Sequence, residues 1–153
     1  MCDLIVRDAL RRAIVFVRQR RPFMQDAFVL MPDHLHCIWT LPEGDVDFST
    51  RWMMIKRAVS MECQGAYPRE ERSASRRKHR DSVIWQRRFW EHQIRNDTDF
   101  ERHADYIHYN PVHHRLARHP GEWAYSSFHR FVKEGKYPLD WTCPATTVDL
   151  DMD

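Results

Sequence analysis

The sequence predicts an α+β fold in which helices cover one face of an antiparallel sheet. Two observations support this class: apolar residues recur with helical spacing in several segments, and two strand-like runs lie close together with turn residues between them. The predicted order is helix, strand, strand, helix, strand, helix, which favours one layer of helices on one sheet. A length of 153 residues is typical of one domain, and six Trp and eight Phe can supply its core.

The first three elements are expected near the N-terminus. A helix is expected over Asp8–Arg20, where apolar residues recur with helical spacing and Arg residues lie between them. Pro22 ends this helix because its ring cannot continue it. The run Ala27–Met31 is typical of a buried strand, and a Pro-Asp turn follows it. His34–Leu41 predicts a second strand, so the two strands are expected to form a hairpin.

The next elements are less regular. Ser49 or Thr50 can cap a helix that runs to about Cys63, with apolar residues at 52, 55 and 59 on one stripe. The segment 83–94 interleaves aromatic and Arg residues, and its second half favours a strand.

The last two helices are expected in the C-terminal third. Asn96 is a suitable N-cap for a helix over Phe100–Tyr109, because acidic residues follow it in the first turn. Pro111 is expected to end this helix or to start a new turn. A final helix is expected over Glu122–Glu134.

Charge is distributed unevenly along the chain. Between Arg51 and Arg95, 12 Lys or Arg residues accompany 5 Asp or Glu residues, an excess of seven positive charges. Part of this excess lies at about 65–82, which has no hydrophobic periodicity and is expected to be a basic surface loop within a single domain, 1–141. The tail, 142–153, is acidic. A basic centre favours a polyanionic partner, but a solvated charged surface explains the composition equally well.

Other features exclude several classes of protein. The four Cys, at 2, 37, 63 and 143, have no CxxC spacing and no secretory signal precedes them, so reduced thiols in the cytoplasm are expected. No apolar run approaches the roughly 20 residues that a membrane span needs, so no membrane association is expected. The motifs of P-loop, dinucleotide-binding and serine-hydrolase sites are all missing from the sequence.

His34-Leu35-His36 is the first candidate for chemistry. Side chains alternate along a strand, so the two imidazoles share one face, while Leu35 and Cys37 point to the opposite face, which we expect to be the core. Two adjacent imidazoles suit one metal ion. So short a pattern is more often a pair of half-exposed histidines on a strand than a metal site, and the pattern alone favours that interpretation.

Tyr106 and Asn110 are the second candidate. They are four residues apart in an expected helix and therefore share a face. A phenol can reach a phosphate, but its ordinary pKa of about 10 makes it a weak nucleophile without a metal or a base. Taken alone, Tyr106 is more simply interpreted as a half-buried core aromatic. Taken alone, Asn110 is more simply interpreted as an N-cap ahead of Pro111.

Arg87 and Arg88 lie between aromatic residues in the segment Trp85–Trp90. Such interleaving suits a surface that neutralises phosphates and stacks bases. An edge strand with buried Trp and solvated Arg explains the pattern equally well.

Four motifs follow one another in a recognisable order: LMPDHLHCIWTLPEGDVDFSTRW at 30–52, IWQRRFWEHQIRN at 84–96, DYIHYNPVHHRL at 105–116 and WAYSSFHRFV at 123–132. Together they resemble the HUH-type tyrosine transposases of small insertion sequences, and among these the REP-associated tyrosine transposases are the most similar. The resemblance covers about residues 8–141. Four separated motifs in order are far more specific than any one alone, so they outweigh the simpler interpretations above.

The resemblance implies a ferredoxin-like α+β sandwich that cleaves and rejoins single-stranded DNA near palindromic hairpins through a 5′-phosphotyrosine intermediate. It implies that His34 and His36 are the HUH histidines, that Tyr106 is the nucleophile and that Asn110 completes a site for Mg²⁺ or Mn²⁺. Further DNA contacts are expected, from charge and position, at Lys56, Arg57, Arg87, Arg88, Arg95 and His113.

The sequence departs from the family in two places. The family opens with a strand before its first helix, and Met1–Val6 is too short to replace that strand, so the sheet is expected to lack it. A truncated start, a partial substitute at Cys2–Val6 and a decayed protein are the three explanations. The family also often has Lys and Gly where His113 and Arg115 stand, and losing a Gly at a left-handed helix end costs up to about 1 kcal/mol.

Three functions therefore compete. The leading one is a metal-dependent transposase that nicks and joins DNA. The alternatives are a non-catalytic hairpin-DNA-binding relative that has lost activity, and a metal-dependent phosphodiesterase that uses bound water. A monomer and a homodimer are both compatible with the sequence.

Overall fold

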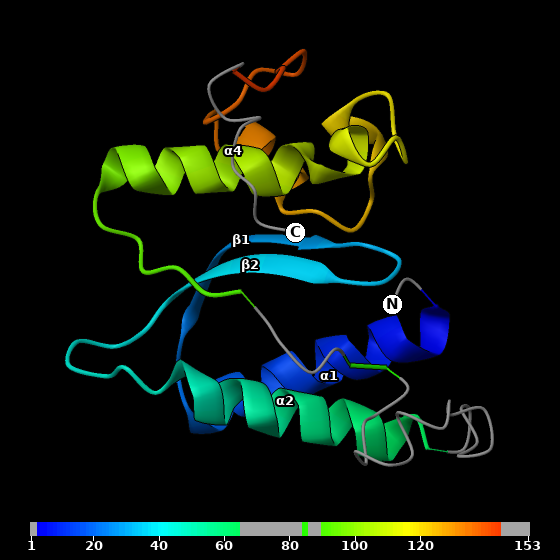
Figure 1. The fold of residues 1–153 in the computed structure, drawn as a ribbon, viewed down its shortest axis with the longest axis vertical. Coiled ribbons are helices and arrows are strands. Elements are labelled where there is room, and N and C mark those ends of the chain that lie inside the picture. Colours follow the sequence, from blue (N-terminus) through cyan, green and yellow to red (C-terminus); the bar gives the residue numbers. More distant parts are fainter. Residues whose placement is uncertain (1–2, 65–83, 86–89, 145–153) are drawn as a thin grey trace. The chain divides into compact units, whose positions relative to one another are not determined.

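The computed structural model describes residues 3–64, 84–85 and 90–144. Its elements are α1 (Leu4–Arg20), β1 (Met24–Leu30), β2 (Leu35–Thr40), α2 (Phe48–Glu62), α4 (Asp97–His113), the short 3₁₀ helix η2 (Pro120–Glu122) and α5 (Phe128–Lys133) (Figure 1). The combination of helices with a two-stranded antiparallel sheet confirms the α+β class. None of the helices in these ranges is long and apolar enough to cross a membrane.

The chain forms two compact units. The helical unit comprises residues 1–24 and 41–89, and the hairpin unit comprises residues 25–40 and 90–153. Several predictions fall outside the described residues: the basic loop at 65–82, the side chains of Arg87 and Arg88, and most of the acidic tail. The strand expected in the second half of 83–94 is wrong where it can be checked, because residues 90–95 have no regular secondary structure.

In the helical unit, α1 begins at Leu4, four residues before the expected start at Asp8. The Asp3 carboxylate accepts the Ile5 N–H at 2.9 Å and so caps the helix. Val6 is already buried, and it extends the apolar stripe by one turn. Residues 4–6 are therefore helical, and they do not substitute for a first strand.

The second helix of this unit, α2, packs along α1 (Figure 1). Ile55 and Val59 are buried, as the stripe predicts. The expected cap at Ser49 or Thr50 is wrong: the Asp47 carboxylate accepts the Thr50 N–H at 3.0 Å. A carboxylate three residues before that N–H has the geometry of a side-chain cap, so the cap lies two to three residues earlier than expected.

Arg51 is 1 % exposed, although sequence reasoning gave it no role beyond its charge. Its guanidinium contacts both carboxylate oxygens of Asp45, at 2.6 and 3.2 Å, and donates to the carbonyl oxygens of Asp47 and Pro22 at 2.7 and 2.9 Å. The hydrogen bonds from Arg51 lower the pKa of Asp45 to about 2. The buried cation therefore ties the segment after α1 to the loop before α2.

In the hairpin unit, β1 and β2 pair as expected, with bounds shifted by a few residues. The Met31 N–H donates to the His34 carbonyl oxygen at 2.9 Å at the turn. At the open end, the Thr40 hydroxyl donates to Asp26 at 2.7 Å. His34 therefore lies in the turn, immediately before β2 begins.

The expected helix over Glu122–Glu134 is wrong in its first half, because α5 spans only Phe128–Lys133. The preceding residues run antiparallel to β1 and hydrogen-bond to it: the Leu30 N–H donates to the Tyr125 carbonyl at 2.9 Å, and the Ser127 N–H donates to the Phe28 carbonyl at 2.8 Å. Pairing with this edge satisfies backbone groups that a longer helix would leave exposed on β1.

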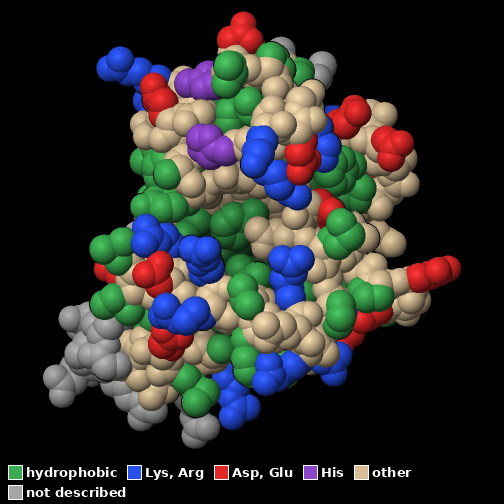
Figure 2. Space-filling view, turned by 180° about the vertical axis from the view of Figure 1, so that it is seen from behind, with side chains coloured by type: hydrophobic (Ala, Val, Ile, Leu, Met, Phe, Trp, Pro, Cys, Tyr) green, Lys and Arg blue, Asp and Glu red, His purple; other side chains and the backbone are tan. Residues whose placement is uncertain are grey.

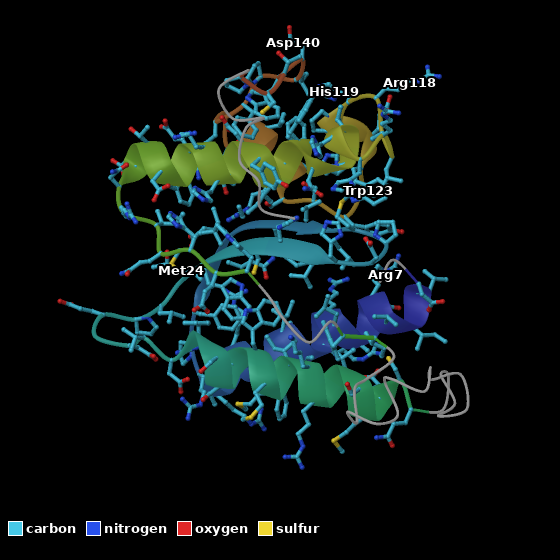
Figure 3. All side chains as sticks on the ribbon, in the orientation of Figure 1. Arg7, Met24, Arg118, His119, Trp123 and Asp140 are labelled. Atoms are coloured by element: carbon cyan, nitrogen blue, oxygen red, sulfur yellow. The ribbon has the colours of Figure 1, made fainter. Side chains whose placement is uncertain are left out.

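Trp123 anchors the same segment. Its indole N–H donates to the Leu30 carbonyl oxygen at 2.9 Å (Figure 3). The ring also packs against the core cluster of the hairpin unit. One side chain thus supplies both apolar burial and a hydrogen bond to β1.

The long helix α4 starts as expected, because the Asn96 side chain accepts the Asp99 N–H at 2.9 Å. Its expected end is wrong. The helix continues through Pro111 to His113, so Asn110 lies inside it and does not cap a new helix. A proline in the last turn removes one intrahelical hydrogen bond, and burial of the Pro111 ring offsets that loss.

The core of the hairpin unit lies between α4 and the hairpin. Ala104 and Ile107 of α4 pack in one cluster with apolar residues of β1, the turn after it, β2 and α5: Ala27, Val29, Met31, Ile38 and Phe131. The small Ala104 allows α4 to approach the sheet closely. This packing sets which residues of α4 face β2.

His108 is a fully buried polar group on α4. Its Nε2 lies 2.7 Å from the Ser127 hydroxyl and its Nδ1 lies 3.2 Å from the Tyr137 hydroxyl, which donates to Asp105 at 2.5 Å. Burial, with a smaller contribution from Arg130, lowers the pKa of His108 to about 3. The imidazole is therefore neutral, and it links α4 to the segment that pairs with β1.

Acid is predicted to destabilise the protein through His108. An unfolded chain protonates this side chain below a pH of about 6.5, whereas the native state resists protonation down to about 3. The free energy of unfolding contributed by His108 is complete above pH 6.5 and decreases as the pH falls toward 3. In urea unfolding between pH 7 and 4, His108→Gln should reduce the pH slope by up to about 1.4 kcal/mol per pH unit. An unchanged slope in a folded His108→Gln protein would contradict this account.

Arg115 lies just beyond α4 with a φ of 59°, the left-handed conformation that favours glycine. The Leu116 N–H donates to the Pro111 carbonyl at 2.8 Å and the Arg115 N–H donates to the Val112 carbonyl at 2.9 Å. These two bonds form a Schellman motif. The left-handed position that the family resemblance suggested is therefore present, and it is occupied by Arg.

Arg115→Gly is predicted to stabilise the protein by up to about 1 kcal/mol, because glycine adopts this conformation without a clash at Cβ. Urea unfolding measures the gain. Arg118→Gly is the matched control: it removes a nearby exposed Arg at a position whose φ is not positive, so it should give no gain. Equal effects of the two substitutions would show that charge, rather than backbone strain, is responsible.

Candidate metal and nucleophile site

The two histidines of the HxH segment lie side by side in the hairpin unit. Their ring centroids are 4.9 Å apart, and both side chains are partly buried. Leu35 and Cys37, which were expected to face the core, are partly buried, and burial raises the pKa of the Cys37 thiol to about 12. Ile38, which shares the face of His36, is the β2 residue that joins the α4 cluster. The histidine face is therefore the face that packs against α4.

Tyr106 and Asn110 of α4 meet this face. Tyr106 is 5 % exposed and Asn110 is fully buried. The Tyr106 ring contacts the His36 ring edge to face, with centroids 5.6 Å apart. The Asn110 Nδ2 atom lies 3.3 Å from His36 Nε2. The structure thus brings together all four residues for which the sequence predicts nucleophile and metal-ligand roles.

Hydrogen bonds orient both imidazoles. His34 Nδ1 lies 2.7 Å from the Asp33 carboxylate, so Nδ1 carries a proton and Nε2 presents a lone pair. The Asn110 amide donates to His36 Nε2, which assigns a lone pair to that nitrogen as well. Desolvation is the largest single influence on Asp33 and would raise its pKa, but the hydrogen bond and electrostatic interaction with His34, together with smaller contributions from the backbone and His114, lower this pKa overall. An ionised carboxylate behind a metal-binding imidazole is a common arrangement.

The donor set fits a divalent cation. Among the described residues, the Asn110 Oδ1 atom is buried and has no hydrogen-bond partner. A buried acceptor left in this way costs about 1–3 kcal/mol, which a bound cation would recover. Two imidazole nitrogens and one amide oxygen bind Mn²⁺ better than Mg²⁺, because Mg²⁺ prefers an all-oxygen environment.

Two further histidines border the site. The His114 ring lies 5.3 Å from the His34 ring, and the His113 ring lies 6.4 Å from the Tyr106 ring. Both are exposed at the end of α4. Sequence reasoning named His113 only as a DNA contact and missed His114. The signal was available, because His114 follows Asn110 by four residues and so shares its helical face.

The expected DNA-contact residues are distributed over both units. Lys56 and Arg57 lie on α2 in the helical unit, whereas Arg95 and His113 lie in the hairpin unit and are exposed. The Lys56 ammonium lies 5.6 Å from the Trp85 ring centroid, and burial lowers its pKa. Lys and Arg side chains, with acidic ones among them, are spread over the face drawn in Figure 2.

Known proteins resemble this chain over most of its length. A REP-associated tyrosine transposase of Escherichia coli strain K12 is 46 % identical over 137 residues, which is 90 % of this chain and 73 % of that protein. A putative REP-associated tyrosine transposase of Haemophilus influenzae is 45 % identical over 124 residues, covering 78 % and 67 % of the two chains. No family model matches the sequence.

The chain belongs to the REP-associated tyrosine transposases. A solved structure of such a transposase bound to a REP hairpin agrees, with a TM-score of 0.75, 45 % identity and coverage of 89 % of this chain and 73 % of that one. The family predicted from the four motifs is therefore confirmed, and with it the class of enzyme. The roles of individual site residues in this transposase stay predictions.

Proposed function

We propose that this transposase cleaves and rejoins single-stranded DNA near hairpins, with Tyr106 as the nucleophile and a divalent cation held by His34, His36 and Asn110. The observation that carries the proposal is the convergence of these four side chains, from β2 with its preceding turn and from α4, in one compact unit. The related transposase bound to a REP hairpin supports hairpin DNA as the substrate.

The reaction is an exchange of phosphodiester oxygens. The Tyr106 oxygen bonds to phosphorus while the bond from phosphorus to the 3′-oxygen breaks. The phenol gives up a proton and the leaving 3′-oxygen takes one up, so the step needs no net acid or base. The products are a 5′-phosphotyrosine link and a free 3′-hydroxyl, and attack by another 3′-hydroxyl reverses the step and joins strands.

Each residue has a separate task in this scheme. The bound cation would supply Lewis-acid polarisation of a phosphate oxygen. Asp33 holds His34 in the tautomer that presents Nε2. Packing against the His36 ring holds the Tyr106 ring in place. The low exposure of Tyr106 keeps competing water away from its phenol.

Basic residues would bind the DNA strand around this centre. Arg95 and His113 are exposed in the hairpin unit, and Lys56 and Arg57 offer positive charge in the helical unit. Phosphate contacts of this kind depend strongly on salt. Arg87 and Arg88 complete the proposed set, and both monomeric and homodimeric forms remain compatible with it.

Tyr106→Phe is predicted to abolish covalent attachment to DNA, because phenylalanine has no oxygen to bond to phosphorus. The protein is incubated with Mn²⁺ and a 5′-labelled and a 3′-labelled single-stranded hairpin oligonucleotide, and a denaturing gel reveals adduct and cleavage. Tyr109→Phe is the matched control, since it removes a hydroxyl three residues further along α4 and should keep the adduct.

Two outcomes would contradict this proposal. Cleavage that survives Tyr106→Phe would indicate a phosphodiesterase that uses water. Binding of the hairpin without cleavage by the unaltered chain would indicate a non-catalytic DNA-binding relative.

Asn110→Ala is predicted to weaken Mn²⁺ binding by at least about ten-fold, because it removes the buried amide oxygen. Calorimetric titration of the protein with Mn²⁺ measures this change. Asn110→Asp keeps an oxygen at the same place and should bind at least as tightly as the unaltered protein. Unchanged affinity in Asn110→Ala would exclude Asn110 as a ligand.

A further inference from the structure

A second group of potential metal ligands lies at the other end of α4. It consists of His92, from the extended segment before the helix, and Asp99 and His103, from its first two turns. From His103 to Asn110 the helix rises by about 10 Å, at roughly 1.5 Å per residue. None of these three residues takes part in the nucleophile and metal site described above.

The three side chains converge closely. One possible ligand atom from each residue lies within 4.8 Å of the others. His92 Nε2 is 2.9 Å from one Asp99 carboxylate oxygen, and His103 Nδ1 is 3.1 Å from the other. Two ligands bound tetrahedrally at zinc distances are about 3.4 Å apart. An imidazole binds a metal in its ring plane, so the two stacked rings must turn out of their parallel arrangement for both nitrogens to point at one ion.

The neighbourhood holds these side chains in position. The Asp99 carboxylate also accepts the Arg95 N–H at 2.9 Å, and the Asp99 carbonyl oxygen lies 2.7 Å from His103 Nδ1. The His92 and His103 rings are stacked, with centroids 4.5 Å apart and an interplanar angle of 6°. Trp90 stacks on the two imidazoles at 5.7 and 6.0 Å. The side chains of His92, Asp99 and His103 are 25, 19 and 8 % exposed.

The ligand chemistry of the cluster suits a transition-metal ion, since two imidazoles and one carboxylate form a common ligand set for zinc and iron(II). His103 Nδ1 now donates to the Asp99 carbonyl oxygen, and His92 Nε2 lies within hydrogen-bond distance of the Asp99 carboxylate. A bound ion would replace the imidazole protons in these hydrogen bonds.

We propose that His92, Asp99 and His103 form a second metal site, which binds a divalent transition-metal ion such as Zn²⁺ in preference to Mg²⁺. The site joins the segment at 90–95 to the first two turns of α4. The ion would thus fix the start of the helix that carries Tyr106 and Asn110. Its role is structural, and the proposal stands independently of the DNA chemistry at the first site.

The test uses the 153-residue chain with His34→Ala and His36→Ala, which removes the imidazoles of the first site. Co²⁺ is the probe, because its visible absorption reports nitrogen and carboxylate ligands, and Zn²⁺ competition then measures relative affinity. We expect one equivalent of Co²⁺ to bind, Zn²⁺ to displace it, and millimolar Mg²⁺ to leave it in place.

Adding His92→Gln to this background should weaken Co²⁺ binding by at least ten-fold, and so should Asp99→Asn. His129→Gln is the matched control: it removes an exposed histidine of α5 and should bind Co²⁺ as the background does. Circular dichroism checks that each variant is folded. If His92→Gln does not fold, the Co²⁺ affinity of Asp99→Asn tests the site.

Two results would overturn the proposal. One is the lack of Co²⁺ binding in the folded background protein, which would leave a hydrogen-bonded cluster without a metal. The other is Co²⁺ binding that neither His92→Gln nor Asp99→Asn weakens. The covalent-adduct assay, made separately on chains with His34 and His36 intact, reports on the Tyr106 chemistry, so the failure of one proposal is distinguishable from the failure of the other.

Discussion

The packing of α4 against the β1–β2 hairpin is the interaction on which the candidate site depends. Ala104 and Ile107 fix how closely the helix approaches the sheet and at what rotation. Because residues three and four apart share a helical face, this rotation places Tyr106 and Asn110 over β2. A change in that core would move the phenol and the amide away from His36, even though neither residue had been altered.

The same helix carries buried polar side chains. His108 and Asn110 are fully buried on α4, where apolar residues would pack with less desolvation. His108 recovers part of this cost through Ser127 and Tyr137. Asn110 recovers it only in part, through His36. Stability is thus given up at the position where a cation would be bound, as expected of a functional site.

Local signals predicted most of this fold. The Asn96 cap, the hairpin and the apolar stripe of α2 depend on neighbouring residues, so periodicity and cap chemistry reveal them. The errors arose where distant contacts decide the conformation. Pro111 stays inside α4 because its ring is buried, and residues 123–127 extend along β1 because that edge offers hydrogen bonds.

The sequence by itself determined the spacing within each pair of site residues: His34 with His36, and Tyr106 with Asn110. These spacings follow from the two-residue repeat of a strand and the 3.6-residue turn of a helix. Family motifs then linked the two pairs. Only the tertiary structure decided that the two pairs meet, and that His92 lies against Asp99 and His103 at the start of α4. These contacts depend on how separate segments pack, which no local repeat encodes.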